Sequence, residues 1–209
     1  MTGTGTTAGT GSAGTGTAGT GAVRTGALRP LEPPFDAATA EQLERWRPPG
    51  LHVEPLALLR LLARHPDLLD RVRPLASGLL GGGLLPPRDR ELLLCRSAVR
   101  AGSDYAWGVH AATLAPQAGL SPEVLDALAR PGGPAALEPA DALLVAAADE
   151  LHDTATLSPA TLDALSDRYD DARLVELVLL CGWYRTLSTL VNAAGLAPEE
   201  WAEPIPATR

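Results

Sequence analysis

The sequence contains no lysine, and all 17 of its basic residues are arginine. Without a lysine side chain the protein cannot form a Schiff base with pyridoxal phosphate or with a carbonyl substrate, and it has no phosphate-loop lysine. The formal net charge is −8 at pH 7, and the arginines are scattered among acidic residues. Nucleic-acid-binding proteins usually mass positive charge on one face, so we expect no nucleic-acid partner.

Cysteine and metal-ligand motifs are also scarce. The two cysteines, Cys95 and Cys181, lie far apart in apolar helical patterns and form no CxxC pair. The sequence allows a disulfide between them, but two buried free thiols fit this context better. The four histidines show no ligand spacing such as HExxH. We therefore expect no metal site and no cofactor.

Long uncharged apolar runs are missing as well. The most apolar stretch carries Arg173, Glu176 and Arg185, so we expect no membrane span, no membrane partner and a soluble, cytoplasmic protein. Residues 1–27 are rich in Thr and Gly and lack the basic start and apolar run of a secretory signal. Such a segment has little apolar surface to offset the entropy of ordering, so we expect a disordered tail. Residues 28–209 suit one domain.

The rest of the chain has apolar residues at helical spacing, and no run alternates as a strand does. This pattern predicts an all-α fold. The last of the expected helices is apolar on nearly every side, which is typical of a bundle centre or a subunit interface. The expected helices cover 37–47, 55–65, 67–80, 87–101, 103–117, 140–152 and 171–194, with two short helices that begin at Ser121 and Ser158. A shared capping rule or a duplicated unit would explain their common text, LSPxxLDAL.

The central segment, ELLLCRSAVRAGSDYAWGVH, carries the residues with the most chemistry. Gly102 ends one expected helix, and Ser103 is placed as the N-cap of the next, with Asp104 as a favourable first-turn acid. Eleven residues separate Glu91 from Ser103, two separate Ser103 from Ala106, and three separate Ala106 from His110.

This spacing resembles the alkylhydroperoxidase D and carboxymuconolactone decarboxylase superfamily, whose peroxidase branch carries E-x11-C-x2-C-x3-H. Glu91 and His110 are retained, and the two cysteine positions are changed to Ser103 and Ala106. A serine hydroxyl is far less acidic than a thiol and cannot reduce a peroxide, so we expect no thiol peroxidase activity through this motif.

Two further segments, LARHPDLLDRVRPLASGLL and DARLVELVLLCGWYRTLSTLVNAAG, extend the resemblance over most of residues 52–196. The resemblance implies an alkylhydroperoxidase D-like helical bundle. It also implies a homo-oligomer, as a dimer, trimer or hexamer, with active sites near the subunit contacts.

The retained pair indicates proton transfer. His110 would act as general base or acid, because imidazole titrates near neutral pH, and Glu91 would orient it. The meeting of these two side chains is implied by the resemblance and not by spacing. Tyr105 and Ser103 would donate hydrogen bonds to developing negative charge.

Five residues are expected to line the substrate site. On the second helix, Trp107 shares a face with Ser103 and His110, and Asp104 lies close to that face. An arginine inside a helix needs an anionic partner, which a substrate carboxylate could be. The expected substrate-binding residues are Trp107, Asp104, Arg100, Trp183 and Tyr184.

Each of these residues also has a purely structural interpretation. His110 could be a core histidine satisfied by Glu91, and Glu91 could pair with Arg88 or Arg90. Ser103 could serve only as a cap. The aromatic residues could belong to the core or to a subunit interface.

These observations predict a cofactor-independent acid/base enzyme of the lyase, isomerase or cyclase type. Its substrate would be a small oxygenated organic acid, lactone or carbonyl compound, and a role in specialised biosynthesis is compatible with the changed motif. The alternatives are a non-catalytic binding or scaffold protein of the same fold, and a residual peroxidase that uses Cys95 or Cys181.

Overall fold

The computed structural model describes residues 28–46, 54–130 and 133–207. Within these ranges the regular structure is helical and no strand occurs, so the predicted all-α fold class is confirmed. The expected tail, 1–27, and His52 lie outside the described residues. The single domain over 28–209 stays a prediction.

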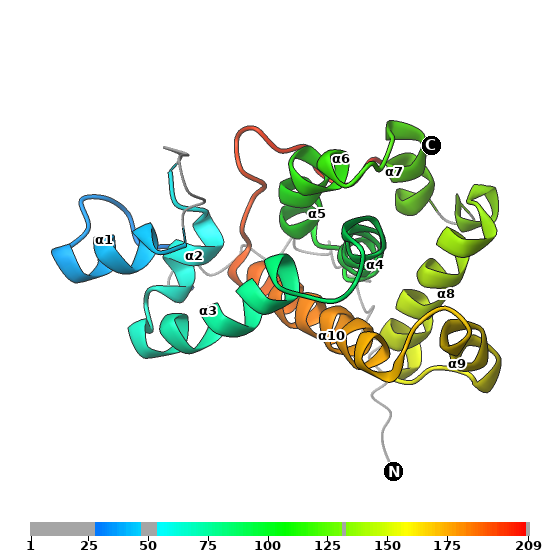
Figure 1. Cartoon of the computed structure of the whole chain (residues 1–209). Helices are drawn as coiled ribbons and strands as arrows, with labels where there is room; N and C mark the ends of the chain where they lie inside the picture. Colours follow the sequence, from blue (N-terminus) through cyan, green and yellow to red (C-terminus); the bar gives the residue numbers. More distant parts are fainter. Residues whose placement is uncertain (1–27, 47–53, 131–132, 208–209) are drawn as a thin grey trace, which may run out of the picture.

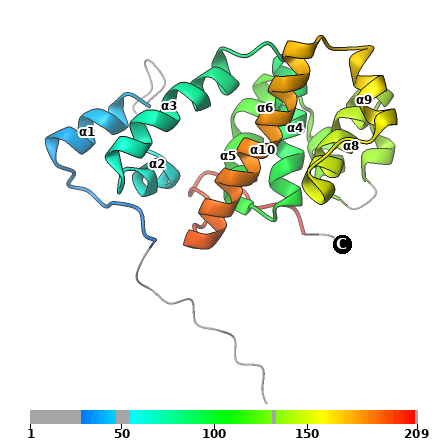
Figure 2. The ribbon, with the colours of Figure 1, turned by 90° about the horizontal axis from the view of Figure 1, so that it is seen from below.

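The helices form three groups, which Figures 1 and 2 show side by side. The N-terminal group, α1 to α3, lies at one end, and α8 and α9 lie at the other. The central group, α4 to α7 with α10, stands between them. The elements are α1 (Ala37–Glu44), α2 (Ala57–Leu62), α3 (Pro66–Gly81), α4 (Pro87–Arg100), α5 (Asp104–Ala112), α6 (Leu114–Gln117), α7 (Pro122–Ala129), η1 (Gly133–Ala136), α8 (Pro139–Thr154), α9 (Pro159–Ser166) and α10 (Asp171–Ala194).

Helix α4 is the centre of the core. It packs against α5, α7, α8 and α10, and Leu92, Leu93 and Leu94 have no exposed surface. Three consecutive buried leucines mean that neighbours cover α4 on several sides, which is why its sequence shows no clean amphipathic stripe. Full burial of each leucine side chain contributes about 1.5–3 kcal/mol to the stability of the fold.

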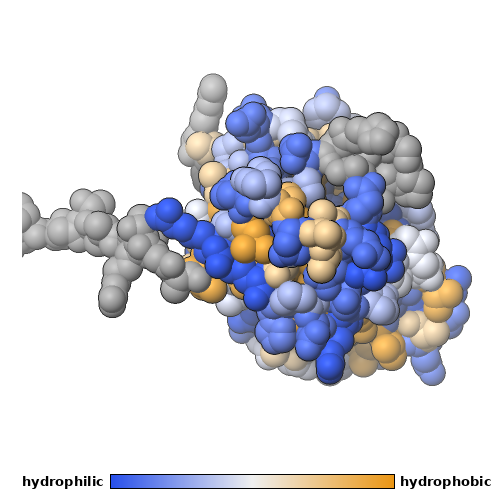
Figure 3. All heavy atoms as spheres, turned by 90° about the vertical axis from the view of Figure 1, so that its left-hand side faces the viewer, coloured by the Kyte–Doolittle hydropathy of each residue, from blue (hydrophilic) through white to orange (hydrophobic). Residues whose placement is uncertain are grey.

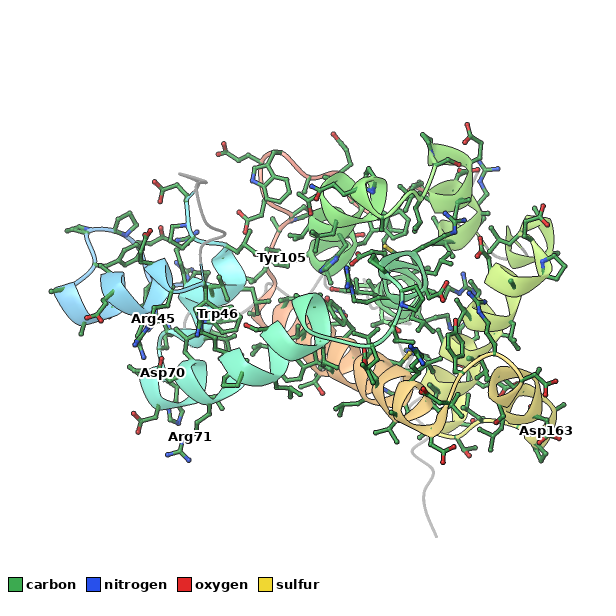
Figure 4. The ribbon with its side chains drawn as sticks, viewed as in Figure 1. Arg45, Trp46, Asp70, Arg71, Tyr105 and Asp163 are labelled. Carbon is green, nitrogen blue, oxygen red and sulfur yellow. The ribbon has the colours of Figure 1, made fainter. Side chains whose placement is uncertain are left out.

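The N-terminal group has a smaller apolar cluster of its own. Leu43 of α1, Leu62 of α2 and Leu69 of α3 are buried together, and Leu190 of α10 packs against them. Arg45 and Asp70 pair across α1 and α3 at 3.3 Å (Figure 4). The outward face of this group is mostly hydrophilic, with separate apolar areas (Figure 3). The cluster thus holds the three helices together and joins them to α10.

Two short helices confirm the capping predictions. Ser121 accepts a hydrogen bond from the N–H of Val124, and Ser158 does the same for Thr161. In both helices proline occupies the first turn, where its missing N–H leaves no bond unmade. The shared capping rule is therefore sufficient to account for the common LSPxxLDAL text.

The predicted helix 103–117 is wrong in one respect, because the chain breaks at Thr113. Here φ is −122° and ψ is −77°, which ends α5 at Ala112 and starts α6 at Leu114. Pro116 explains the break: a continuous helix would need a hydrogen bond from residue 116 to the carbonyl of Ala112, and proline has no N–H. In the new helix Pro116 falls in the first turn. The predicted helix 37–47 also ends earlier, at Glu44.

Helix α10 differs from the expectation that no apolar run is long enough for a membrane span. By length and composition it could cross a membrane, with a mean hydropathy of 1.4 over its most apolar window, of which 33% is buried. A core helix of a bundle has the same composition, and α10 buries Leu177, Leu180 and Tyr184 in the central apolar cluster. The cytoplasmic location stays a prediction.

Candidate active site

A tight turn places α4 and α5 as neighbours. Gly102 has φ +58°, a conformation that favours glycine, and its N–H bonds to the carbonyl of Val99. The N–H of Ser103 reaches back to the carbonyl of Ala98, which completes a Schellman motif. Ser103 also starts α5, because its Oγ accepts a hydrogen bond from the N–H of Ala106 at 3.3 Å. One serine therefore ends one helix and caps the next.

This turn brings Glu91 on α4 to His110 on α5. Oε2 of Glu91 lies 2.9 Å from Nδ1 of His110, and Oε1 accepts a hydrogen bond from Nε of Arg90 at 3.2 Å. Glu91 is completely buried and His110 is 6% exposed. A buried carboxylate needs such partners, since an unpaired charge in the interior costs several kcal/mol.

The second nitrogen of His110 meets α10. Nε2 lies 3.0 Å from the hydroxyl oxygen of Tyr184, which is also buried. A carboxylate can only accept hydrogen bonds, so the Nδ1–H donates to Glu91, and in the neutral ring Nε2 accepts from the Tyr184 O–H. Three helices thus supply one continuous chain of hydrogen bonds, Glu91–His110–Tyr184, which we call the buried relay.

The hydroxyl at the end of the buried relay keeps its proton. Burial raises the pKa of Tyr184 well above its usual value, and the charge of Glu91 and the nearby Cys95 add to this effect, while Arg90 opposes it. Tyr184 is therefore a neutral hydrogen-bond donor at physiological pH. In chemical terms the buried relay offers a base with a defined tautomer and a phenol beside it.

Comparison with known proteins identifies the fold. The model of the Carboxymuconolactone decarboxylase family matches residues 66–150, which include both Glu91 and His110. Over residues 66–150 the chain is therefore similar to this family. Among solved structures, an uncharacterized peroxidase-related protein from Silicibacter sp. TM1040 superposes with a TM-score of 0.69. At 16% identity over 82% of this chain and 90% of that chain, it shares the fold. No curated protein matches the chain.

Tyr105 does not join the buried relay. Its hydroxyl donates to Oε1 of Glu199 and accepts from the N–H of Leu58 at 3.0 Å, so it lies between α5 and α2 (Figure 4). Burial raises the pKa of Tyr105, and the bond to Glu199 raises it further. The predicted role beside His110 is therefore corrected. Five positions along a helix turn a side chain to another face, as the sequence spacing of 105 and 110 already implies.

Ser103 has no free hydroxyl for a substrate. It is completely buried, and its Oγ serves as the cap of α5. Of the two interpretations considered for this residue, the structure supports the cap. Ser103 and Tyr105 together supply no donor to the buried relay, and Tyr184 stands where the sequence analysis placed those two.

The other predicted binding residues are dispersed. Asp104 accepts a hydrogen bond from the N–H of Ile205 in the C-terminal segment. Arg100 pairs with Asp153 and lies 3.6 Å from Asp149, so its anionic partners are structural acids of α8. Neither side chain contacts the buried relay in the described residues.

The two tryptophans of the predicted site lie in or against the central apolar cluster. Trp107 is 3% exposed, and Trp183 packs partly buried against the same cluster. The Nε1 of Trp183 is buried and has no hydrogen-bond partner among the described residues. Trp107 is therefore a core residue, whereas the indole N–H of Trp183 is a donor without an acceptor among the described residues.

Both thiols lie in the interior as free cysteines, as expected. Burial raises the pKa of Cys95 well above its usual value, with the charge of Glu91 adding to it. Burial also raises the pKa of Cys181 to about 11, against a smaller opposing effect of Ser97. Since the thiolate is the reactive form, neither cysteine fits the peroxidase alternative.

The sequence left open whether Arg88 or Arg90 pairs with Glu91, and Arg90 was not among the predicted site residues. The structure selects Arg90, because Arg88 instead pairs with Asp141 at 2.6 Å and with the carbonyl of Gly119. The signal was present in the sequence, since Arg90 directly precedes Glu91. Helical spacing alone could not tell which of the two arginines turns inward.

A hollow of about 370 Å³ lies elsewhere, between α1 and the start of α3. Its lining includes Asp36, Thr39, Gln42, Arg45 and Pro66, none of which belongs to the predicted site. Within the ranges that the structure describes, no group of three or more potential ligands gathers to hold a metal ion.

Proposed function

We propose that this protein is a cofactor-independent acid/base enzyme that acts on a small oxygenated organic acid, lactone or carbonyl compound. The observation that carries the proposal is the buried relay, in which Glu91, His110 and Tyr184 are joined by hydrogen bonds of 2.9 and 3.0 Å. A histidine held in one tautomer by a carboxylate is a positioned general base.

In the proposed mechanism, Nε2 of His110 takes a proton from the substrate. The substrate replaces the hydroxyl of Tyr184 at Nε2, and that hydroxyl then donates a hydrogen bond to the oxygen on which negative charge develops. Glu91 stabilises the imidazolium that forms, and His110 returns the proton to the product. Because the ring is only 6% exposed, the surrounding side chains must move to admit the substrate.

Decarboxylation, lactone opening, isomerisation and cyclisation share this proton transfer, so the proposal covers this group of reactions. A role in specialised biosynthesis is compatible with a motif that has lost both redox cysteines.

The test uses His110→Gln and Glu91→Gln against a panel of small lactones and keto acids, with turnover and proton exchange followed by NMR. We expect both variants to lose about 10²–10⁴-fold in turnover. His152→Gln is the matched control, because the backbone carbonyl of that histidine accepts a hydrogen bond from Arg185 and its side chain makes none among the described residues. If His110→Gln and Glu91→Gln fold and retain full turnover, the proposal is wrong.

A second candidate is a non-catalytic binding or scaffold protein of the same fold. It is favoured by the same geometry, since both nitrogens of His110 already have partners, as a structural histidine would. This candidate predicts that the two relay variants lose stability while no compound of the panel is converted by the natural sequence.

A further inference from the structure

Arg90 differs from the other largely buried arginines of the core. Its side chain is 13% exposed and its Nε donates to Glu91, yet Nη1 and Nη2 donate to no described residue. Arg96, by contrast, uses Nε, Nη1 and Nη2 on Asp149 and on the carbonyl of Leu128. Neither Nη atom of Arg90 is among the sealed, unpartnered nitrogens of the described residues, so both are open to solvent.

The position of this open guanidinium edge follows from its neighbours. Arg90 is bonded to Glu91, which is bonded to His110, so the charge stands two hydrogen bonds away from the imidazole. Arg90 is also close enough to lower the pKa of Tyr184 against the larger effects of burial and Glu91. The free N–H groups therefore lie at the border between solvent and the buried relay.

An arginine in this position has more N–H donors than its structural task needs. One N–H neutralises Glu91, whereas a guanidinium offers five donors in a planar fork that matches a carboxylate. A purely structural arginine in the interior would normally satisfy its remaining donors, as Arg96 does.

We propose that Arg90 binds the carboxylate of the substrate through Nη1 and Nη2, and so restricts the substrate class to small anionic carboxylic acids. This inference rests on the proposed proton relay and narrows it, because it disfavours neutral lactones and ketones. A carboxylate held there would lie at the solvent end of the hydrogen-bonded chain that leads through Glu91 to His110. Arg90 is then the residue that determines specificity, and His110 the residue that moves the proton.

The test measures binding and does not depend on knowing the substrate. The probes are acetate and benzoate, each compared with its neutral amide, acetamide and benzamide. Affinities come from NMR titration of ¹⁵N-labelled protein, in which the Nε–H signal of Arg90 reports changes at the adjacent Nη groups. We expect each carboxylate that binds to shift this signal and to bind at least about 10-fold more tightly than its amide.

The variants separate a ligand contact from a structural role. Arg90→Gln is expected to weaken carboxylate binding by about 10–100-fold and amide binding by less than about 2-fold. Arg130→Gln removes the same charge from an exposed i,i+4 pair with Asp126 and should change neither affinity. If Arg90→Gln does not fold, Arg90→Lys replaces it: it keeps the charge but loses the fork, and should bind the carboxylates more weakly than the natural sequence does.

Two results would overturn the proposal: equal binding of carboxylate and amide, or an Nε–H signal of Arg90 that does not respond. Its failure is distinguishable from failure of the proposed function. His110→Gln should retain the carboxylate preference while losing turnover. If it retains turnover, the relay is wrong, and the assignment of Arg90 as an anion site is then judged by binding alone.

Discussion

The rings of His110 and Tyr184 meet edge to face, with their centroids 5.2 Å apart and an angle of 86° between their planes. This arrangement directs the phenol oxygen to Nε2 at 3.0 Å and fixes the ring from the side opposite to Glu91. An imidazole held at both nitrogens cannot rotate, which is what a positioned base requires.

Tyr184→Phe should preserve the ring contact and remove only this hydrogen bond. We expect a loss of stability of about 1–3 kcal/mol, because Nε2 remains buried without a donor. Turnover, once a substrate is known, should also fall. Urea denaturation measures the first effect, and Tyr169→Phe, which removes a buried hydroxyl bonded to Asp89, gives the scale for a tyrosine outside the site.

The protein should lose stability at alkaline pH through its tyrosines. Burial is the main cause that raises the pKa of Tyr105, Tyr169 and Tyr184, the three tyrosines of the chain. Below the pKa of about 10 that a tyrosine has in the unfolded chain, all three are protonated in the folded and the unfolded state, so the free energy of unfolding does not change with pH through them. As the pH rises above about 10, the unfolded chain loses protons that the folded protein keeps, and stability falls. Tyrosinate absorbance should therefore rise together with unfolding, and gradual ionisation of the folded protein near pH 10 would contradict this.

The two thiols should not react with external reagents in the folded protein. Because burial raises the pKa of Cys95 and Cys181, we expect a thiol-specific reagent at neutral pH to label neither until the chain unfolds. Labelling in denaturant provides the full signal for comparison. Rapid labelling of either cysteine under native conditions, together with peroxide consumption, would revive the peroxidase alternative.

Gly108→Ala should loosen the C-terminal segment from α5. A Cβ at this position would lie 2.8 Å from the carbonyl oxygen of Glu203 and 3.1 Å from the Cβ of Ala202, so backbone would have to move. We expect destabilisation of about 1–3 kcal/mol. Gly182→Ala is the matched control, because no atom lies within 4 Å of its Cβ position, and alanine there should stabilise the helix by up to about 1 kcal/mol.

The homo-oligomer implied by the family resemblance should use the outer face of α10. Val175, Val178 and Leu179 are 68%, 43% and 47% exposed there. The nearby charged side chains have partners outside this face. Glu176 accepts hydrogen bonds from the N–H groups of residues 84 and 85, and Arg185 donates to a carbonyl of α8. An uncharged apolar face is best covered by a second copy of itself.

Light scattering after size-exclusion chromatography tests this prediction. Val178→Glu should shift the assembly to monomers, whereas Leu162→Glu, which charges an exposed leucine on α9, should not. A protein that is monomeric at every concentration would show that the family's assembly does not extend to this chain.

Much of the helical framework could be predicted because its signals are local. Pro87, Gly102 and Ser103 set the start of α4, its end and the cap of α5 through backbone geometry and near-neighbour hydrogen bonds. The break at Thr113 was missed even though its cause, Pro116, is local, because a proline can start a helix as well as end one.

The chain's own residue order determined which chemistry is present: an acid and an imidazole at family spacing, no working thiol, and no lysine. Only the tertiary structure decided which groups meet, choosing Arg90 over Arg88 for Glu91 and Tyr184 over Tyr105 for His110. The physical reason is that helical periodicity tells which residues share a face, while the packing of α4, α5 and α10 against one another decides what each face touches.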